Sequence, residues 1–276
     1  MKQYEFDSIG THWWLEILDD SASFTPELIA TLAATAEQFD QRYSRFRDDS
    51  LVSELFRTGR LSHPPAEMIR MLNFAREMHE VSHGAFDITV GNDLHRMGYG
   101  QRSVARDIDT TKFWEEVAIT PVEIILPSKI MLDFGGFGKG WLIDMFVREL
   151  KLADVHAFIV NGGGDLYVQS DKPIRLGLED PLDATRSIGN ISIRQGGLAG
   201  SNSVKRTWDD GEIRRHHIID PATHDSSASP VLASFVAAES ALIADTMATI
   251  LIIQPELERE LSERYGLNVM LVRRTD

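Results

Sequence analysis

The stretch ESALIADTMATILII, residues 239–253, is mostly apolar and predicts a buried helix. Within it, Asp245 and Thr249 lie four residues apart, so a helix presents both side-chain oxygens on one face. Mg²⁺ commonly binds one or two carboxylates and completes its shell with neutral oxygens and substrate phosphates, which makes this pair a candidate metal site. At this spacing alone, a local hydrogen bond or a solvated face is the commoner outcome.

Length and charge set limits on the class of protein. The 276 residues suffice for a single domain over residues 1–276, with two closely packed lobes as an alternative. Hydrophobic residues make up 43% of the chain and charged residues 25%, as in ordinary globular proteins. The net charge of -14 argues against a nucleic-acid partner, because a phosphate-binding surface needs clustered Lys and Arg. We therefore expect any bound phosphate to arrive with a metal ion.

Further classes are excluded by what the chain lacks. It has no cysteine, which rules out disulfides, thiolate nucleophiles and zinc-thiolate or iron-sulfur sites. Residues 1–7 carry acidic side chains where a signal peptide needs an apolar core. No apolar run approaches the roughly 18 to 20 residues that cross a bilayer. We expect a cytoplasmic protein without a membrane span.

The pattern of apolar residues and turn formers predicts an α+β fold with mixed sheets and packed helices. Expected helices begin at Thr25, cover about 65–82, 140–150 and 239–253, and include a short one that begins at Pro255. Expected strands cover residues 11–18, 130–134, 157–160, 166–168, 174–178, 188–193 and 267–272.

Two glycine-rich segments could approach a ligand closely: LDFGGFGKG at 132–140 and NGGGD at 161–165. The first precedes an expected helix, so its backbone N–H groups and Lys139 suit an anion. It is not a nucleotide P-loop, because Asp133 stands where the first glycine is needed and Gly140 follows the lysine. For a glycine-rich turn of this kind, a purely structural role is about as common as ligand binding. The second segment is equally well explained as a tight hairpin turn.

Other polar groups carry weaker signals. His217, in the sequence HHIIDP at 216–221, could contact phosphate or move a proton, although a hydrogen-bonded structural histidine is the usual alternative. Ser201 lacks the flanking pattern of a nucleophile elbow. Phe46, between Arg45 and Arg47, could stack on a planar ring while the arginines neutralise phosphate.

Taken in order along the chain, these segments resemble the FAD:protein FMN transferase family, also called the ApbE family. The resemblance covers nearly the whole chain and rests on residues 9–11, 44–46, 48–50, 84–91, 97–100, 133–140 with Asp144, 161–165, 199–206, 217–221 and 244–249. It implies an ApbE-like, T-fold-like architecture and an enzyme that binds FAD with Mg²⁺, transfers FMN to a threonine of an acceptor protein and releases AMP.

The resemblance also implies roles for individual residues. The metal would be held by the side chains of Asp245 and Thr249 and the backbone carbonyl of Gly136. FAD would be bound by Ile9, Phe46, Ala85, Phe86, Asp87, Asp133, Lys139 and Ile219. Lys139 would neutralise charge on the diphosphate, and the base for the acceptor threonine would be His217, with Asp165 as the second choice.

The chain departs from the family pattern near the expected flavin or acceptor end. Many relatives have Thr-Ser-Gly where this chain has Gly200, Ser201 and Asn202, and Gly where it has His224. Two alternatives to transfer therefore stay open. One is a Mg²⁺-dependent FAD pyrophosphatase that releases FMN and AMP to water. The other is a non-catalytic FAD-binding module.

Overall fold

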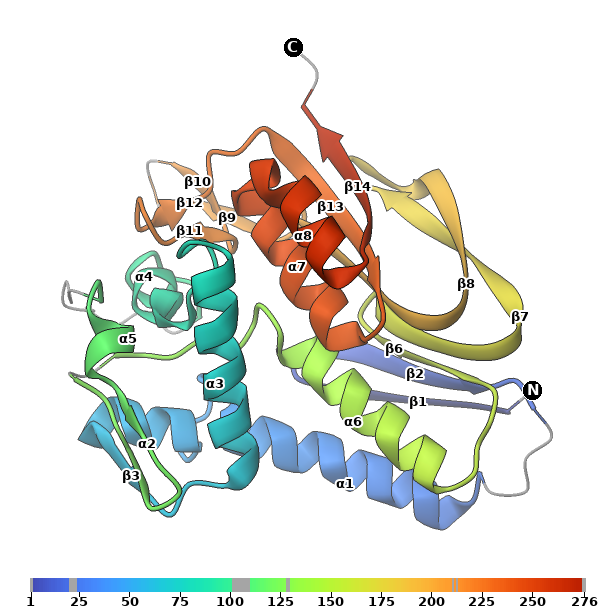
Figure 1. The fold of residues 1–276 in the computed structure, drawn as a ribbon, viewed down its shortest axis with the longest axis horizontal. Coiled ribbons are helices and arrows are strands. Elements are labelled where there is room, and N and C mark those ends of the chain that lie inside the picture. Colours follow the sequence, from blue (N-terminus) through green and yellow to red (C-terminus); the bar gives the residue numbers. More distant parts are fainter. Residues whose placement is uncertain are drawn as a thin grey trace. The chain divides into compact units, whose positions relative to one another are not determined.

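The computed structural model describes residues 2–19, 24–100, 110–127, 130–209, 211 and 213–274. The chain divides into two compact units. The first unit comprises Met1–Asp40, Phe137–Lys205 and Ser229–Asp276, and the second comprises Gln41–Gly136 and Arg206–Ala228. Helices and antiparallel sheets are both present (Figure 1), so the predicted α+β class is confirmed. The single domain over residues 1–276 stays a prediction.

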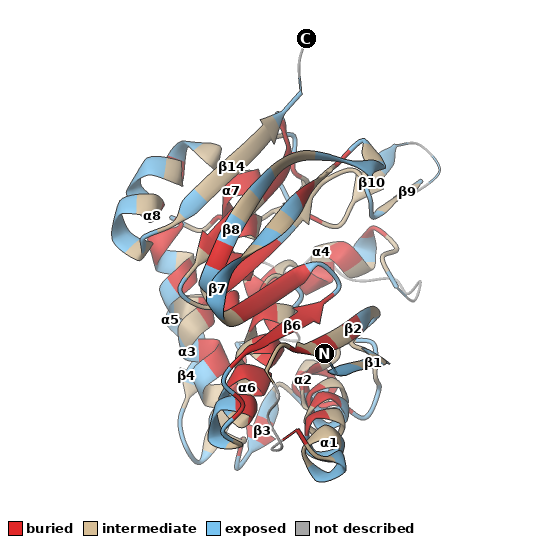
Figure 2. Cartoon of the chain, turned by 90° about the vertical axis from the view of Figure 1, so that its right-hand side faces the viewer, coloured by how far each residue is buried: buried red, intermediate tan, exposed pale blue. Residues whose placement is uncertain are grey.

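A seven-stranded sheet forms the first unit's framework, in the order β1-β2-β6-β7-β8-β13-β14. All of its recorded pairings are antiparallel. Its strands are β1 (Lys2–Ser8), β2 (Thr11–Ile17), β6 (Phe158–Gly162), β7 (Asp165–Asp180), β8 (Asp183–Asn202), β13 (Val231–Ala238) and β14 (Asn268–Arg273). Figure 2 shows β6 as buried along its length, which matches its central position and its run of apolar residues.

The β7–β8 hairpin is longer than its sequence pattern indicates. The two strands expected at 166–168 and 174–178 are parts of the single strand β7 (Asp165–Asp180). Its pairing with β8 shifts register between Gln169 and Ile174, so the alternation of apolar side chains is interrupted while the strand continues.

Helices α6 (Gly138–Leu152) and α7 (Ala241–Ile253) bring the first unit's polar groups together. Both match expected helices, as do α1 (Pro26–Tyr43), η2 (Pro255–Leu257) and α8 (Glu258–Tyr265). Glycines allow α7 to approach its neighbours closely: an added Cβ on Gly197 would lie 2.5 Å from the carbonyl oxygen of Ser240. Main-chain contact of this kind fixes the position of α7 against β8.

The second unit combines short helices with small sheets. Its helices are α2 (Leu51–Thr58), α3 (Ala66–Val81), η1 (Ile88–Val90), α4 (Gly91–Arg96) and α5 (Phe113–Glu116). A three-stranded sheet has the order β3-β5-β4, and β9 with β10 and β11 with β12 form two-stranded ribbons. Their bounds are β3 (Arg60–Ser62), β4 (Ala118–Ile119), β5 (Glu123–Ile125), β9 (Thr207–Asp209), β10 (Arg214–His216), β11 (Ile219–Asp220) and β12 (Asp225–Ser226).

The prediction of a strand at residues 130–134 is wrong. The segment is not assigned to a strand. Its backbone donors reach other partners: the N–H of Met131 donates to the Asn92 side chain at 2.6 Å, and the N–H of Asp133 donates to the carbonyl of Ile88 at 2.7 Å. The prediction failed because a short apolar run can be buried either as a strand or as an irregular segment, and the amino-acid composition is the same in both cases.

Within the described ranges, none of the helices combines the length and the apolar character that crossing a bilayer requires.

Candidate active site

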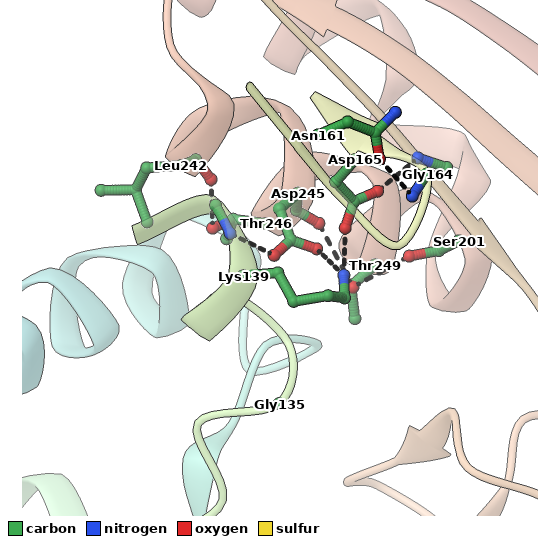
Figure 3. A network of polar contacts seen from close by, with 12 residues as sticks. Gly135, Lys139, Asn161, Gly164, Asp165, Ser201, Leu242, Asp245, Thr246 and Thr249 are labelled. Carbon is green, nitrogen blue, oxygen red and sulfur yellow. Dashed lines mark hydrogen bonds and ion pairs between the residues drawn. The ribbon is translucent and has the colours of Figure 1, made fainter. Parts of the chain in front are cut away.

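Lys139, Asp165 and Asp245 form a buried lysine–carboxylate cluster in the first unit (Figure 3). The ammonium of Lys139 is paired with Asp165 and lies 3.2 Å from Oδ1 of Asp245. Both carboxylate side chains are only 3% exposed, and that of Lys139 is 22% exposed. Two carboxylates share one ammonium, so the cluster carries an excess negative charge when all three groups are ionised.

Asp165 reaches the cluster from a tight hairpin. Gly163 and Gly164 connect β6 to β7 with φ of 69° and 104°, which glycine adopts easily. A side chain on Gly163 would overlap Thr11, and the Asn161 side chain accepts the N–H of Gly164 at 2.9 Å. The hairpin interpretation of NGGGD is therefore correct, and the turn places Asp165 as the first residue of β7.

Both carboxylate oxygens of Asp165 are engaged. Oδ1 accepts the backbone N–H of Gly200 at 3.0 Å, while Oδ2 accepts from Lys139. Each oxygen of Asp165 therefore holds a hydrogen-bond donor in place. This geometry favours a role for Asp165 in orienting Lys139.

Asp245 is held at both oxygens as well. Oδ2 accepts the backbone N–H of Gly140 at 2.9 Å, and Oδ1 faces Lys139. Burial raises the pKa of Asp245 to about 7, with Lys139 acting in the opposite direction and Asp165 adding to the rise. For Lys139, burial alone would lower the pKa, but the two carboxylates hold it above its ordinary value. Lys139 is therefore protonated at neutral pH.

Thr249 lies one helical turn beyond Asp245. Its hydroxyl donates to the carbonyl of Asp245 at 3.3 Å and is 3.2 Å from Oγ of Ser201 on β8. The local hydrogen bond considered for this spacing is thus present, and a second hydroxyl lies next to it. Ser201 pairs across the sheet with Ser234, a register that the sequence pattern around it does not reveal.

The residues of the lysine–carboxylate cluster, with Thr249 and Ser201, fit a hard divalent cation. An excess buried negative charge and neutral hydroxyl oxygens are what Mg²⁺ uses when substrate phosphates complete its shell. In the part of the chain that the structure describes, no cluster of three or more histidine or acidic side chains forms a complete metal cage. A metal site here would therefore depend on few side chains.

The second unit holds a different charged group. Arg45 is ion-paired with Asp133, and the two side chains are only 5% and 13% exposed. The guanidinium lies 4.2 Å from the ring centroid of Phe46 and 5.5 Å from that of Tyr99. Asp133 also accepts the backbone N–H of Gly135 at 2.6 Å. Phe46 itself is 54% exposed, so an aromatic face beside a cation is accessible.

Tyr99 also belongs to a group of neighbouring rings with Trp208 and His217. The ring of Tyr99 lies 5.0 Å from that of Trp208 and 6.4 Å from that of His217, measured between centroids. Ile219 is buried in an apolar cluster with Leu94 and Met97. Predicted residues 217 and 219 thus lie among aromatic and apolar neighbours of the second unit.

The segment Ala85, Phe86 and Asp87 has two buried residues and one that caps a helix. Ala85 and Phe86 are buried, and Asp87 accepts the N–H of Thr89 at 2.7 Å at the start of η1. His79 lies 3.2 Å from the other Asp87 oxygen. Burial acts to lower the pKa of His79, but the hydrogen bond and charge of Asp87 outweigh it and raise that pKa.

The remaining predicted residues lie in turns. Ile9 has φ of 42° between β1 and β2, an unusual conformation for a β-branched side chain. Gly136 is the last residue of the second unit's first segment. The structure thus brings Lys139, Asp165, Asp245 and Thr249 together in the first unit, while Phe46 and Asp133 share contacts with Arg45 in the second.

Comparison with known proteins supplies the family. A model of the ApbE family matches residues 9–271. The chain belongs to the ApbE family. Among its curated relatives, the FAD:protein FMN transferase of Vibrio cholerae is 25% identical over 87% of this chain and 77% of its own length. The FAD:protein FMN transferase of Escherichia coli strain K12 is 24% identical over 97% of this chain and 83% of its own length.

Solved structures of the ApbE family share the fold. The ApbE protein of Thermotoga maritima superposes with a TM-score of 0.84, at 20% identity, over 99% of this chain and 94% of its own. The flavinyl transferase ApbE of Pseudomonas stutzeri gives a TM-score of 0.83, at 20% identity, over 100% of this chain and 92% of its own. The predicted ApbE-like architecture is confirmed.

Proposed function

We propose that this protein is a FAD:protein FMN transferase that requires Mg²⁺ and uses a threonine of an acceptor protein. In the reaction, the threonine oxygen forms a bond to the FMN phosphorus, the bond from that phosphorus to the bridging oxygen breaks, and AMP leaves. The observation that carries the proposal is the buried lysine–carboxylate cluster with its excess negative charge and adjoining hydroxyls, in a member of the ApbE family.

Asp245 and Thr249 are the side chains proposed to hold the metal, and the carbonyl of Gly136 is the predicted backbone ligand. When bound, Mg²⁺ would supply charge neutralisation on the diphosphate. Asp245 suits this role because the N–H of Gly140 donates to one of its oxygens and so orients the carboxylate. This donor is a neutral amide, so the carboxylate keeps its negative charge for a cation. Thr249 contributes a neutral oxygen whose proton has acceptors in the Asp245 carbonyl and Ser201.

Lys139 is the proposed electrostatic partner of the diphosphate. Its raised pKa keeps the ammonium charged, and Asp165 prevents it from moving away. A fixed cation stabilises charge that develops on phosphate oxygens and needs little reorganisation during the reaction. Both oxygens of Asp165 are occupied, so we place it as the orienting residue for Lys139.

His217 is the proposed base for the acceptor threonine. Its ring stacks near Tyr99, and imidazole is the side chain whose ordinary pKa best suits proton transfer at neutral pH. Phe46, Ala85, Phe86, Asp87, Asp133 and Ile219, together with Ile9 and Lys139 in the first unit, remain the proposed FAD contacts. Among them, Phe46 has an exposed ring beside the Arg45 guanidinium, an arrangement suited to a planar group.

The test is incubation of the protein with FAD, Mg²⁺ and an acceptor that carries an Asp-x-x-(Ser/Ala/Gly)-Thr segment. We expect the acceptor to gain one FMN group by intact mass and AMP to appear in equal amount. An acceptor with the threonine changed to valine is the matched control and should stay unmodified. Release of FMN and AMP at the same rate without an acceptor would replace transfer with pyrophosphatase activity. Tight FAD binding with no AMP would make the protein a binding module.

A further inference from the structure

Helices α6 and α7 cap each other's first turns. The backbone N–H groups of Ala241 and Leu242, the first two residues of α7, donate to Oδ1 and Oδ2 of Asp144 at 3.0 Å each. In return, the N–H of Gly140 in the first turn of α6 donates to Asp245 at 2.9 Å. Each helix thus supplies a carboxylate that accepts the otherwise unpaired donors at the start of the other.

The exchange has an internal symmetry. Asp144 lies four residues after Gly140, and Asp245 lies four residues after Ala241, so on each helix the donor and the acceptor are one turn apart on one face. Between them the backbones touch: a Cβ on Gly140 would lie 2.5 Å from the carbonyl oxygen of Ala241 and 2.8 Å from Cα of Leu242. The position of α7 along α6 is therefore fixed by the carboxylates of Asp144 and Asp245 and by the close approach at Gly140.

The consequence concerns the direction of the Asp245 carboxylate. With Oδ2 held by Gly140, Oδ1 is turned toward Lys139. That arrangement depends on α7 staying in register with α6. Asp144 supplies the two hydrogen bonds that fix α7 at its first turn, four residues before Asp245.

We propose that Asp144 is a positioning residue, which sets the carboxylate of Asp245 for binding a divalent cation by locking the register of α7 on α6. The inference rests on the proposed metal role of Asp245. Asp144 itself touches neither the cation nor FAD in this scheme, because both of its oxygens are used by α7 amides.

Binding of Mn²⁺ alone, measured by calorimetry on the full-length protein without FAD, tests the proposal separately from activity. Asp144→Ala should weaken Mn²⁺ binding by about tenfold or more, as removal of a group that orients a metal ligand does. Asp144→Asn keeps one acceptor oxygen and should give a smaller loss. At saturating Mg²⁺, kcat should return to within about threefold of the wild type, because the ligands are still present.

Ser50→Ala is the matched control for loss of a helix cap. Ser50 accepts the N–H of Ser53 at the start of α2 in the second unit, so its removal should lower the melting temperature without changing Mn²⁺ affinity. If Asp144→Ala does not fold, Asp144→Asn provides the same comparison. A lowered melting temperature with unchanged Mn²⁺ affinity in the Asp144 variants would overturn the positioning role. Failure of the wild-type protein to bind Mn²⁺ both alone and with FAD present would instead overturn the proposed metal site.

Discussion

The two units of this protein each bury a cation beside carboxylates, but in different proportions. In the first unit, Lys139 is shared by Asp165 and Asp245, so one negative charge is left over when all three groups are ionised. In the second, Asp133 is the carboxylate that pairs with Arg45 among the described residues, and Arg45 lies against the rings of Phe46 and Tyr99. The first arrangement suits a further cation, whereas the second is already balanced and offers an aromatic surface. Both units contain buried charges, so the number of carboxylates for each cation is what distinguishes the candidate metal site from the candidate ring-binding site.

The largest effect is expected at the carboxylate with the excess charge. Asp245→Asn keeps the shape of the side chain and removes its charge, so Mg²⁺ affinity and AMP release should fall by about a hundredfold or more. Without metal, the same variant should melt at a higher temperature, since it removes a buried charge that its surroundings disfavour. Calorimetry and a thermal melt measure the two effects. Unchanged Mg²⁺ affinity would remove Asp245 from the proposed site.

A second prediction concerns the shared ammonium. Lys139→Met leaves two nearby buried carboxylates without their cation, and we expect the free energy of unfolding to fall by about 3 kcal/mol. Excess Mg²⁺ should restore part of this loss, because the metal can neutralise the same carboxylates. Thermal melts with and without Mg²⁺ provide the measurement. A loss that Mg²⁺ leaves untouched would mean that the carboxylates do not bind it.

Arg45→Met is the matched variant in the second unit. It should cost less, about 2 kcal/mol, because Asp133 keeps the N–H of Gly135 as a donor. Here Mg²⁺ should restore nothing, since a single carboxylate remains where the first unit has two. The same melts test this contrast, and equal rescue of both variants by Mg²⁺ would contradict the difference drawn between the units.

The smallest expected effect is a pH dependence in the second unit. Asp87 raises the pKa of His79 above its ordinary 6.5 despite the opposing effect of burial, so the folded state holds the proton more tightly than the unfolded state. The stability from this pair is complete below the ordinary pKa and is lost as pH rises through the folded one. His79→Gln should therefore reduce the loss of stability that urea unfolding shows as pH rises above the ordinary 6.5. An identical pH dependence in variant and wild type would exclude the pair as its source.

Local sequence patterns predicted most of the elements that position the candidate site. The apolar spacing of residues 239–253 matches helix α7, and the glycine-rich segment before residue 138 leads into helix α6. Both helices could be predicted because their patterns depend on interactions between residues one or two turns apart. The segment 130–134 failed because its composition cannot distinguish a strand from a buried irregular segment whose donors reach Asn92 and Ile88.

Pairings between distant residues could not be predicted from spacing. Asp165 comes to Lys139 through the register of β6 and β7, and Ser201 comes to Thr249 through the position of α7 on β8. Asp144 carried no chemical signal of its own, because its role depends on the first turn of a helix about a hundred residues further along the chain. The family resemblance named Asp245, Thr249 and Lys139, and the structure adds the groups that hold them.

The central claim is best tested by an anomalous difference map from crystals grown with Mn²⁺ and FAD. The account predicts a peak at coordination distance, about 2.0–2.4 Å, from an Asp245 carboxylate oxygen and from Oγ1 of Thr249, with the FAD diphosphate in the same coordination shell. A bound FAD whose diphosphate lies away from these two side chains, or a Mn²⁺ peak at other residues, would contradict it.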